Sequence, residues 1–350
     1  MGTLIQSDFR PPKWLSNPHL QTLWPTLTRR IDPPPRTCEV VTTPDGDFLE
    51  LDWCGHQGPL VLILHGLAGS SRSHYVLGLQ WALLRQGWRS VAMNFRGCGR
   101  QLNRTAKCYH SGETGDLDFI YHHIRRRSPR TPLAAVGYSL GGNVLLKWLG
   151  ERGNNTDLFA ACAVSVPFVL SRCADAMERG FAKVYRHRLL SELKEYLKAK
   201  IRHLERLGQA AEAEKLRALG DLRKVRSFWK YDDRVIARLY PFRDVHDYYR
   251  RCSSRRFLAH IRIPTLVIQS RDDPFMYPDV IPPPEETAPE VQMEITSRGG
   301  HVGFIAATSE GGIDYWLEHR IPLFLRQQLS QSGHLDLNLP WPGALPFGNV

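Results

Sequence analysis

Gly137-Tyr138-Ser139-Leu140-Gly141 is the stretch that decides the fold of this chain. The apolar run 133–136 before it has the composition of a buried strand, and the leucine-rich segment 143–149 after it has a helical pattern. A G-x-S-x-G sequence between a strand and a helix is typical of a nucleophile elbow, where a serine hydroxyl projects from a sharp turn above a sheet. A glycine-rich turn with an incidental serine is the alternative, and the flanking strand and helix disfavour it.

Strand-like and helix-like segments alternate on both sides of this elbow. Residues 37–54 have the pattern of a β-hairpin around Pro44-Asp45-Gly46, and the unbroken apolar run 60–64 is typical of a strand buried on both faces. Further strands are expected over residues 90–95, 160–166, 264–269 and 291–296, and helices near residues 75–85, 113–127 and 313–328. This alternation predicts a doubly wound, mostly parallel sheet of the α/β class.

The alternation stops over residues 167–257, where no strand pattern occurs. Here leucines and an isoleucine recur on one helical face between Leu190 and Leu207, while Lys, Arg and Glu fill the other faces. We interpret this segment as a helical insertion that forms a lid over the active site. Extra helices packed on the core are the alternative.

The remaining domain boundaries follow from this insertion. The predicted core is made of residues 36–166 and 258–328. Residues 1–35 are rich in proline, which disfavours long helices, and are expected to form an extended arm laid over the core. Residues 329–350 are expected to be a loosely held tail.

Two later loops supply an acid and a histidine. The strand expected to end at Gln269 is followed by Ser270-Arg271-Asp272-Asp273-Pro274, and the next strand by Gly299-Gly300-His301. Serine, then acid, then histidine is the chain order of the α/β-hydrolase fold, and loops at the carboxyl ends of parallel strands gather at one edge of a sheet. Ser139 is therefore the predicted nucleophile, His301 the base that takes its proton, and Asp273 the acid that orients the imidazole.

Two adjacent aspartates compete for the role of the acid. In this fold the acid commonly lies three residues after a small residue that ends the strand, and counting from Ser270 gives Asp273. Pro274 restricts the backbone of Asp273 and so helps to fix its side chain. Asp272 is expected to point elsewhere, where it accepts loop N–H groups or meets solvent.

An oxyanion hole is expected from two backbone N–H groups. One belongs to Leu140, directly after the serine, and the other to the loop His65-Gly66-Leu67, most readily to Leu67 itself. His65 is expected to brace this loop. The alternative is an ordinary turn between a strand and a helix.

Seven motifs together resemble the YheT-like α/β-hydrolases, which are related to eukaryotic α/β-hydrolase-domain lipases and to yeast medium-chain ester synthases and esterases. The motifs are Asn17-Pro18-His19-Leu20-Gln21-Thr22, His65-Gly66-Leu67-Ala68-Gly69-Ser70-Ser71, Asn94-Phe95-Arg96-Gly97-Cys98-Gly99, Tyr109-His110-Ser111-Gly112-Glu113-Thr114, Gly137-Tyr138-Ser139-Leu140-Gly141-Gly142-Asn143, Asp272-Asp273-Pro274-Phe275 and Gly299-Gly300-His301-Val302-Gly303-Phe304. The resemblance implies hydrolysis of carboxylic esters, such as acylglycerols or other medium-chain esters, without a cofactor. Ser270 departs from the wider fold, where many relatives carry glycine. Residues 186–224 match no motif, so substrate selectivity does not follow from the resemblance.

Composition limits the setting in which such a protein works. Of 350 residues, 42% are hydrophobic and 23% charged, which is ordinary for a globular protein. No run is long and apolar enough to span a membrane, no signal peptide is evident, and seven dispersed cysteines include no C-x-x-C pair. A cytoplasmic protein with free thiols and no bound metal is therefore expected.

The net charge of +11 raises the question of an acidic partner. No nucleic-acid-binding motif accompanies the dispersed basic residues, so no nucleic-acid partner is expected, and a solvated basic surface is the favoured interpretation. Peripheral contact with an anionic membrane stays open.

Two functions other than hydrolysis are compatible with the same residues. An acyltransferase, in which an alcohol replaces water, needs the same acyl-enzyme. A ligand-binding protein on a hydrolase fold need not use the serine at all. The sequence predicts a serine esterase with a small, lipid-like ester substrate, and leaves acyl length and oligomeric state open.

Overall fold

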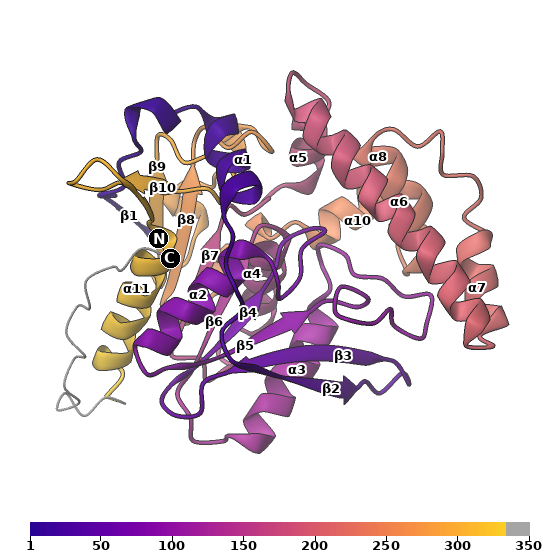
Figure 1. Ribbon diagram of the computed structural model, residues 1–350, viewed down its shortest axis with the longest axis horizontal. Coiled ribbons are helices and arrows are strands. Elements are labelled where there is room, and N and C mark those ends of the chain that lie inside the picture. Colours follow the sequence, from indigo (N-terminus) through magenta and orange to yellow (C-terminus); the bar gives the residue numbers. More distant parts are fainter. Residues whose placement is uncertain (334–350) are drawn as a thin grey trace.

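The computed structural model describes residues 1–333, and a nine-stranded sheet lies at its centre (Figure 1). The strand order is β1-β9-β8-β7-β6-β4-β5-β3-β2, in which β3 pairs antiparallel with β2 and β5 and all other pairs are parallel. The strands are β1 (Thr3–Ile5), β2 (Arg36–Thr42), β3 (Phe48–Cys54), β4 (Leu60–Leu64), β5 (Arg89–Asn94), β6 (Leu133–Tyr138), β7 (Ala160–Val164), β8 (Thr265–Ser270) and β9 (Val291–Thr296). The predicted mostly parallel sheet is confirmed.

Helices cover both faces of this sheet. The side chains of strand β4 alternate between the two faces: Leu60, Leu62 and Leu64 belong to one apolar cluster, and Val61 and Ile63 belong to the cluster on the other face. The first cluster includes α3 (Thr114–Arg127) and α4 (Leu140–Arg152), and the second includes α2 (His74–Arg85) and α11 (Leu317–Gln331). This two-sided burial explains why the central strands are continuous apolar runs.

The end of the chain differs from its prediction. The helix expected near 313–328 starts later, because Ile313–Tyr315 forms strand β11, which pairs antiparallel with β10 (Ile305–Ala307). Helix α11 continues to Gln331, beyond the predicted end of the core at residue 328. Residues 334–350 of the predicted tail lie outside the described residues.

The segment between β7 and β8 is helical and has a core of its own. It contains α5 (Leu170–Ala176), α6 (Ala182–Arg206), α7 (Ala210–Arg217), α8 (Phe228–Tyr231), the π-helical turn η2 (Asp232–Ile236), α9 (Ala237–Leu239), α10 (Val245–Cys252) and η3 (Arg255–His260). On α6, Leu190, Leu193, Leu197 and Leu204 are buried in a separate apolar cluster, whereas Leu207 is exposed. The predicted leucine face therefore ends at Leu204.

The prediction of an extended N-terminal arm is wrong. Residues 3–5 form β1 at the edge of the sheet, and α1 (Pro18–Thr28) is an eleven-residue helix. Asn17 caps this helix by accepting the N–H groups of His19 and Leu20 at 2.9 and 3.3 Å, and Pro18 occupies its first position, where a missing N–H costs nothing. The prolines of residues 1–35 are expected to disfavour a helix, but proline at the first position of a helix favours it.

A buried cluster of charges fixes the loops that follow β5. The Arg96 guanidinium, 5% exposed, donates to both carboxylate oxygens of Asp116 at 2.7 and 2.8 Å, and also to Asp45 and Asp47 at 3.0 and 3.1 Å. Because removing one member would leave the others as buried unpaired charges, this cluster holds its segments in one arrangement. The loop so held carries Tyr109 to the site described next.

Candidate active site

Ser139 lies in a strained turn between β6 and α4. Its φ of 51° and ψ of −118° lie where a side chain is rarely tolerated. The turn also brings backbones into close approach, because a Cβ atom on Gly137 would lie 2.5 Å from the Gly141 carbonyl oxygen, and one on Gly141 would lie 2.5 Å from the His65 oxygen. Both glycines are therefore required, and the serine stands at the start of α4.

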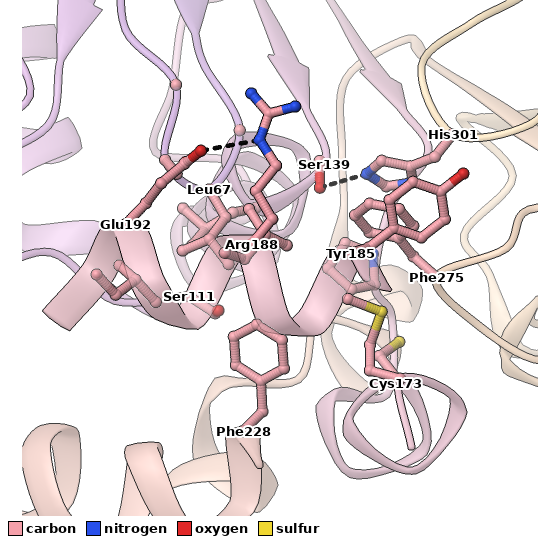
Figure 2. Close-up of a pocket in the computed structure, with 18 of the residues that line it drawn as sticks. Leu67, Ser111, Ser139, Cys173, Tyr185, Arg188, Glu192, Phe228, Phe275 and His301 are labelled. Atoms are coloured by element: carbon pink, nitrogen blue, oxygen red, sulfur yellow. Dashed lines mark hydrogen bonds and ion pairs between the residues drawn. The ribbon is translucent and has the colours of Figure 1, made fainter. Parts of the chain in front are cut away.

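A continuous chain of hydrogen bonds links Ser139, His301 and Asp273. His301 Nε2 lies 2.9 Å from Ser139 Oγ, an interaction drawn in Figure 2, and His301 Nδ1 lies 2.7 Å from Asp273 Oδ2. Ser139 follows β6, His301 follows β9 and Asp273 follows β8, three strands of the central sheet. The arrangement can pass the Ser139 proton to the imidazole while the carboxylate holds the ring and faces the resulting positive charge.

The two adjacent aspartates have separate partners. Asp273 Oδ1 accepts the N–H of Phe275 at 2.9 Å, which leaves Oδ2 for His301. Asp272 turns to the other side of the loop, where its Oδ1 accepts the Gly300 N–H at 3.0 Å, and burial raises the pKa of its carboxyl. The structure thus places Asp273, and not Asp272, against the histidine.

Helix α1 holds the loop that carries His301, a contact that the sequence did not reveal. Thr22 Oγ1 accepts the His301 N–H at 2.9 Å. A Cβ atom on Gly300 would lie 2.5 Å from the Pro18 carbonyl oxygen, and Gly300 has a φ of +60°. Glycine at position 300 therefore lets α1 pack against the loop.

Two further side chains fix the same loop. The Phe275 ring stacks on the His301 ring, with centroids 4.0 Å apart and an interplanar angle of 7° (Figure 2). Ser270 Oγ donates to the Gly300 carbonyl oxygen at 2.8 Å. The serine that departs from the usual glycine therefore ties the acid loop to the histidine loop. The position of Phe275 directly after Asp273-Pro274 was the only sequence signal for its role.

The loop after β4 presents the backbone of Leu67 to the pocket. Residues 66–69 form a turn closed by a 3.1 Å hydrogen bond from the Gly69 N–H to the Gly66 oxygen, with Ala68 strained at a φ of 55°. Two tyrosine hydroxyls hold this turn, since Tyr75 accepts the Gly66 N–H at 3.0 Å and Tyr109 accepts the Ala68 N–H at 2.9 Å. The roles of these tyrosines were missed from sequence, because Tyr109 lies 41 residues from Ala68 along the chain and Tyr75, nine residues from Gly66, lies in a helix whose contact with the turn has no local sequence signal.

The two N–H groups predicted for the oxyanion hole are those of Leu67 and Leu140. Within residues 1–333, neither donates a hydrogen bond to another residue, and both residues line the same pocket as Ser139. His65 braces the loop as expected: its Nδ1 lies 2.8 Å from the Gly66 oxygen and its Nε2 accepts the Phe95 N–H at 3.2 Å. Burial lowers the pKa of His65 to about 4, so the ring stays neutral at physiological pH.

Ser139 and His301 open onto a pocket of about 430 Å³. Its walls come from the loops above the sheet, from α1 and from the helical insertion, and most of the lining is apolar. Figure 2 shows Phe228 on the side of the pocket away from Ser139, and Tyr185 beside His301. The contributions of the insertion include Leu170, Cys173, Met177, Tyr185, Leu189, Leu193, Phe228 and Ile236.

Two carboxyl groups line the pocket, Glu192, which pairs with Arg188, and Asp232. Asp232, at the start of the π-helical turn η2, accepts a 2.6 Å hydrogen bond from the Tyr249 hydroxyl. Burial raises the pKa of Asp232 to about 7. The group is thus mostly neutral at slightly acidic pH, which suits an apolar surrounding.

The part of the chain that the structure describes holds no cluster of three or more His, Cys, Asp or Glu side chains that could bind a metal ion. None of its helices is both long and apolar enough to cross a membrane.

Comparison with known proteins identifies the family. Residues 59–308 match the model of the alpha/beta hydrolase fold family. The chain belongs to the α/β-hydrolases. It is 41% identical to YheT of Escherichia coli (strain K12) over 336 residues, covering 92% of this chain and 94% of that protein. It is also 29% identical to phospholipase ABHD3 of Mus musculus over 317 residues, covering 86% and 74%.

A solved structure agrees with the fold. The esterase Pf2001 of Pyrococcus furiosus superposes with a TM-score of 0.54 at 16% identity, covering 85% of this chain and 98% of that one. It agrees with the α/β-hydrolase fold that the family model shows, and the 41% identity to YheT confirms the YheT-like resemblance. This α/β-hydrolase is a carboxylic ester hydrolase.

Replacing each aspartate of the acid loop by asparagine distinguishes their roles. Asp273→Asn should lower kcat for ester hydrolysis by roughly 10⁴-fold, because an amide in place of Oδ2 stabilises the wrong histidine tautomer. Asp272→Asn should cost far less, because an asparagine oxygen can still accept the Gly300 N–H. The measurement is kcat for a soluble p-nitrophenyl ester in both folded variants. The reverse order of the two losses would contradict the assignment.

Asp232→Asn should change how stability depends on pH. In the folded protein the raised pKa favours the protonated acid, so stability is complete below the ordinary pKa of 3.8 and falls as the pH rises toward about 7. The variant lacks this loss and should be more stable than the native chain at about pH 8, by roughly 2 kcal/mol, with little difference at about pH 4. Urea unfolding at both pH values measures this, with the exposed Asp32→Asn as control. Equal effects at both pH values would refute it.

Proposed function

We propose that this protein is a serine esterase that hydrolyses medium-chain or acylglycerol-type esters through an acyl-enzyme. The observation that carries the proposal is the hydrogen-bonded chain from Ser139 through His301 to Asp273, which opens onto an apolar pocket. A nucleophile with an aligned base and an orienting acid is the arrangement that acyl transfer requires.

In acylation, Ser139 Oγ attacks the ester carbonyl carbon while His301 Nε2 takes its proton. The carbonyl oxygen becomes an oxyanion, for which the N–H groups of Leu67 and Leu140 are the proposed donors. When the tetrahedral intermediate collapses, the C–O bond to the alcohol breaks and His301 returns the proton to the leaving oxygen. Asp273 keeps the ring oriented and stabilises its cationic form.

In deacylation, water takes the place of the alcohol. His301 removes a proton from the water as its oxygen attacks the acyl carbon, and then protonates Ser139 Oγ as the acid leaves. Every proton moves between Ser139, His301, substrate and water, so the mechanism needs no cofactor and no metal.

Pocket shape supports a substrate with an acyl chain rather than a small polar ester. Its volume of about 430 Å³ falls within the range of small-molecule sites, and its lining is mainly hydrophobic. A relative of this chain is named a phospholipase, so lipid-like esters are the substrate class that we favour.

We further propose that the insertion of residues 167–257 serves as a lid above the core of residues 36–166 and 258–328. Helices α5, α6 and α8 contribute apolar side chains to the wall of the pocket opposite the sheet, and this position supports a lid role. A cytoplasmic setting also belongs to the proposal, since the seven cysteines are free thiols, as suits a reducing compartment.

Ser139→Ala tests the mechanism directly. It should lower kcat for p-nitrophenyl ester hydrolysis by on the order of 10³-fold or more, because members of such a triad act as a unit. It should also abolish labelling by a fluorophosphonate probe, while Ser111→Ala, another serine that lines the pocket, keeps both. Substantial hydrolysis by the folded Ser139→Ala variant would disprove the nucleophile, and normal labelling without turnover would favour a ligand-binding protein.

Phe228→Ala tests the acyl pocket. Removing this ring from the lid wall should shift the preferred p-nitrophenyl ester toward longer chains and change kcat/KM for a two-carbon ester by less than about threefold, because a short chain does not reach the far wall. Phe257→Ala, outside this pocket, is the matched control. An unchanged chain-length profile in a folded Phe228→Ala variant would count against the acyl channel.

A further inference from the structure

Five large apolar side chains are exposed on two neighbouring helical segments. Ten large hydrophobic side chains are exposed among residues 1–333. Five of them lie on α1, just before α1 or at the start of α6. We call this set the α1–α6 face; its members are between 45% and 64% exposed and are Trp14, Leu20, Leu27, Phe181 and Val184. Such a concentration marks a contact surface more often than chance exposure does.

Ring contacts join the two halves of the α1–α6 face. The Trp14 ring packs edge-on against Trp24, at a centroid distance of 4.9 Å, and Trp24 follows Leu20 by one helical turn. Across the gap, the His19 ring lies 4.7 Å from the Phe181 ring. In Figure 1, α1 and the turn that leads into α6 stand together at the top of the molecule. The contact of His19 with Phe181 therefore places the start of α1 beside the start of α6, the two segments that carry the exposed apolar side chains.

The surroundings of the α1–α6 face are positively charged. Residues 9–31 contain four Arg or Lys and no Asp or Glu, and residues 179–191 also contain four with none. Three of these cations, Arg29, Arg186 and Arg188, pair with Glu318, Glu178 and Glu192, while Lys13 and Lys183 are exposed at the surface. An apolar surface with a cationic border is complementary to a bilayer that carries anionic headgroups.

The same two helices line the mouth of the pocket that holds Ser139. Leu23 and Thr26 of α1 and Arg188 and Leu189 of α6 line the pocket, next to the exposed members of the face. A surface in contact with the α1–α6 face would therefore lie directly beside the pocket.

We propose that the α1–α6 face docks this protein onto the surface of an anionic phospholipid bilayer. The exposed apolar side chains enter the boundary between headgroups and acyl chains, and the bordering cations contact lipid phosphates. Docking rests on the exposed surface alone. Delivery of a lipid ester from the bilayer into the pocket rests, in addition, on the proposed esterase function.

Vesicle binding tests the docking. The native chain should co-sediment with vesicles of phosphatidylcholine mixed with phosphatidylglycerol, bind vesicles of pure phosphatidylcholine much more weakly, and lose binding at high salt. The double variant Leu27→Ser, Phe181→Ser should bind the mixed vesicles about tenfold more weakly. Leu323→Ser, which removes an exposed leucine from α11, should bind like the native chain.

A charge reversal tests the cationic border. Lys183→Glu should weaken binding to the mixed vesicles by about fivefold or more, and Lys198→Glu, an exposed lysine farther along α6, should change it far less. Each variant should keep its melting temperature and its rate on soluble p-nitrophenyl acetate, because none of the replaced side chains lines the pocket. If the native chain bound vesicles but hydrolysed no ester, the esterase proposal would fail while docking stood.

Other outcomes would overturn the docking. The first is an absence of binding to the mixed vesicles, and the second is equal binding by the double variant and the native chain. A third is a dimer in light scattering that the double variant abolishes, which would assign the face to a second copy of the chain.

Discussion

The strained backbone of Ser139 is the constraint on which the rest of the structure depends. A residue at φ 51° persists only where its surroundings leave it no alternative, and here Gly137 and Gly141 allow neighbouring backbones to approach to distances that no side chain would permit. The apolar strands on both sides of β6 fix those backbones in place. The strain is therefore supported by the burial of the sheet, and it aims the hydroxyl at His301.

The histidine is held by parts of the chain that lie far apart in sequence. Thr22 binds its N–H, Phe275 stacks on its ring and Asp273 binds its Nδ1, so α1 and the loop after β8 meet at one side chain. The helix that replaces the expected extended arm thus belongs to the support of the site. Contacts on several sides keep the position of this imidazole ring constant without help from a bound molecule.

The helical insertion and α1 both line the pocket that holds Ser139. Their inner surfaces line the pocket with apolar side chains, and their outer surfaces form the α1–α6 face. One pair of elements thereby connects the substrate site to a candidate membrane surface. Burial raises the pKa of Asp232 to about 7, so this lining carboxyl is protonated at slightly acidic pH, which fits the apolar character of the interior.

The sequence by itself determined the sheet, the elbow and the identity of the predicted triad, because each depends on local patterns: apolar runs, glycines around a serine, and loops after strands. It could not place Thr22, Tyr75, Tyr109 or Asp232, because their roles arise from contacts between segments that only the folded chain brings together. The N-terminal helix was missed for a related reason. Proline lowers helix propensity in the interior, yet Pro18 is tolerated at the first position, and Pro25 inside the helix is tolerated where tertiary packing stabilises α1. Counting from Ser270 predicted Asp273 as the acid, but only the tertiary structure decided the atoms in contact, because the loops after β8 and β9 meet only in the folded chain: Asp273 Oδ2 lies 2.7 Å from His301 Nδ1, and Asp272 Oδ1 accepts the Gly300 N–H.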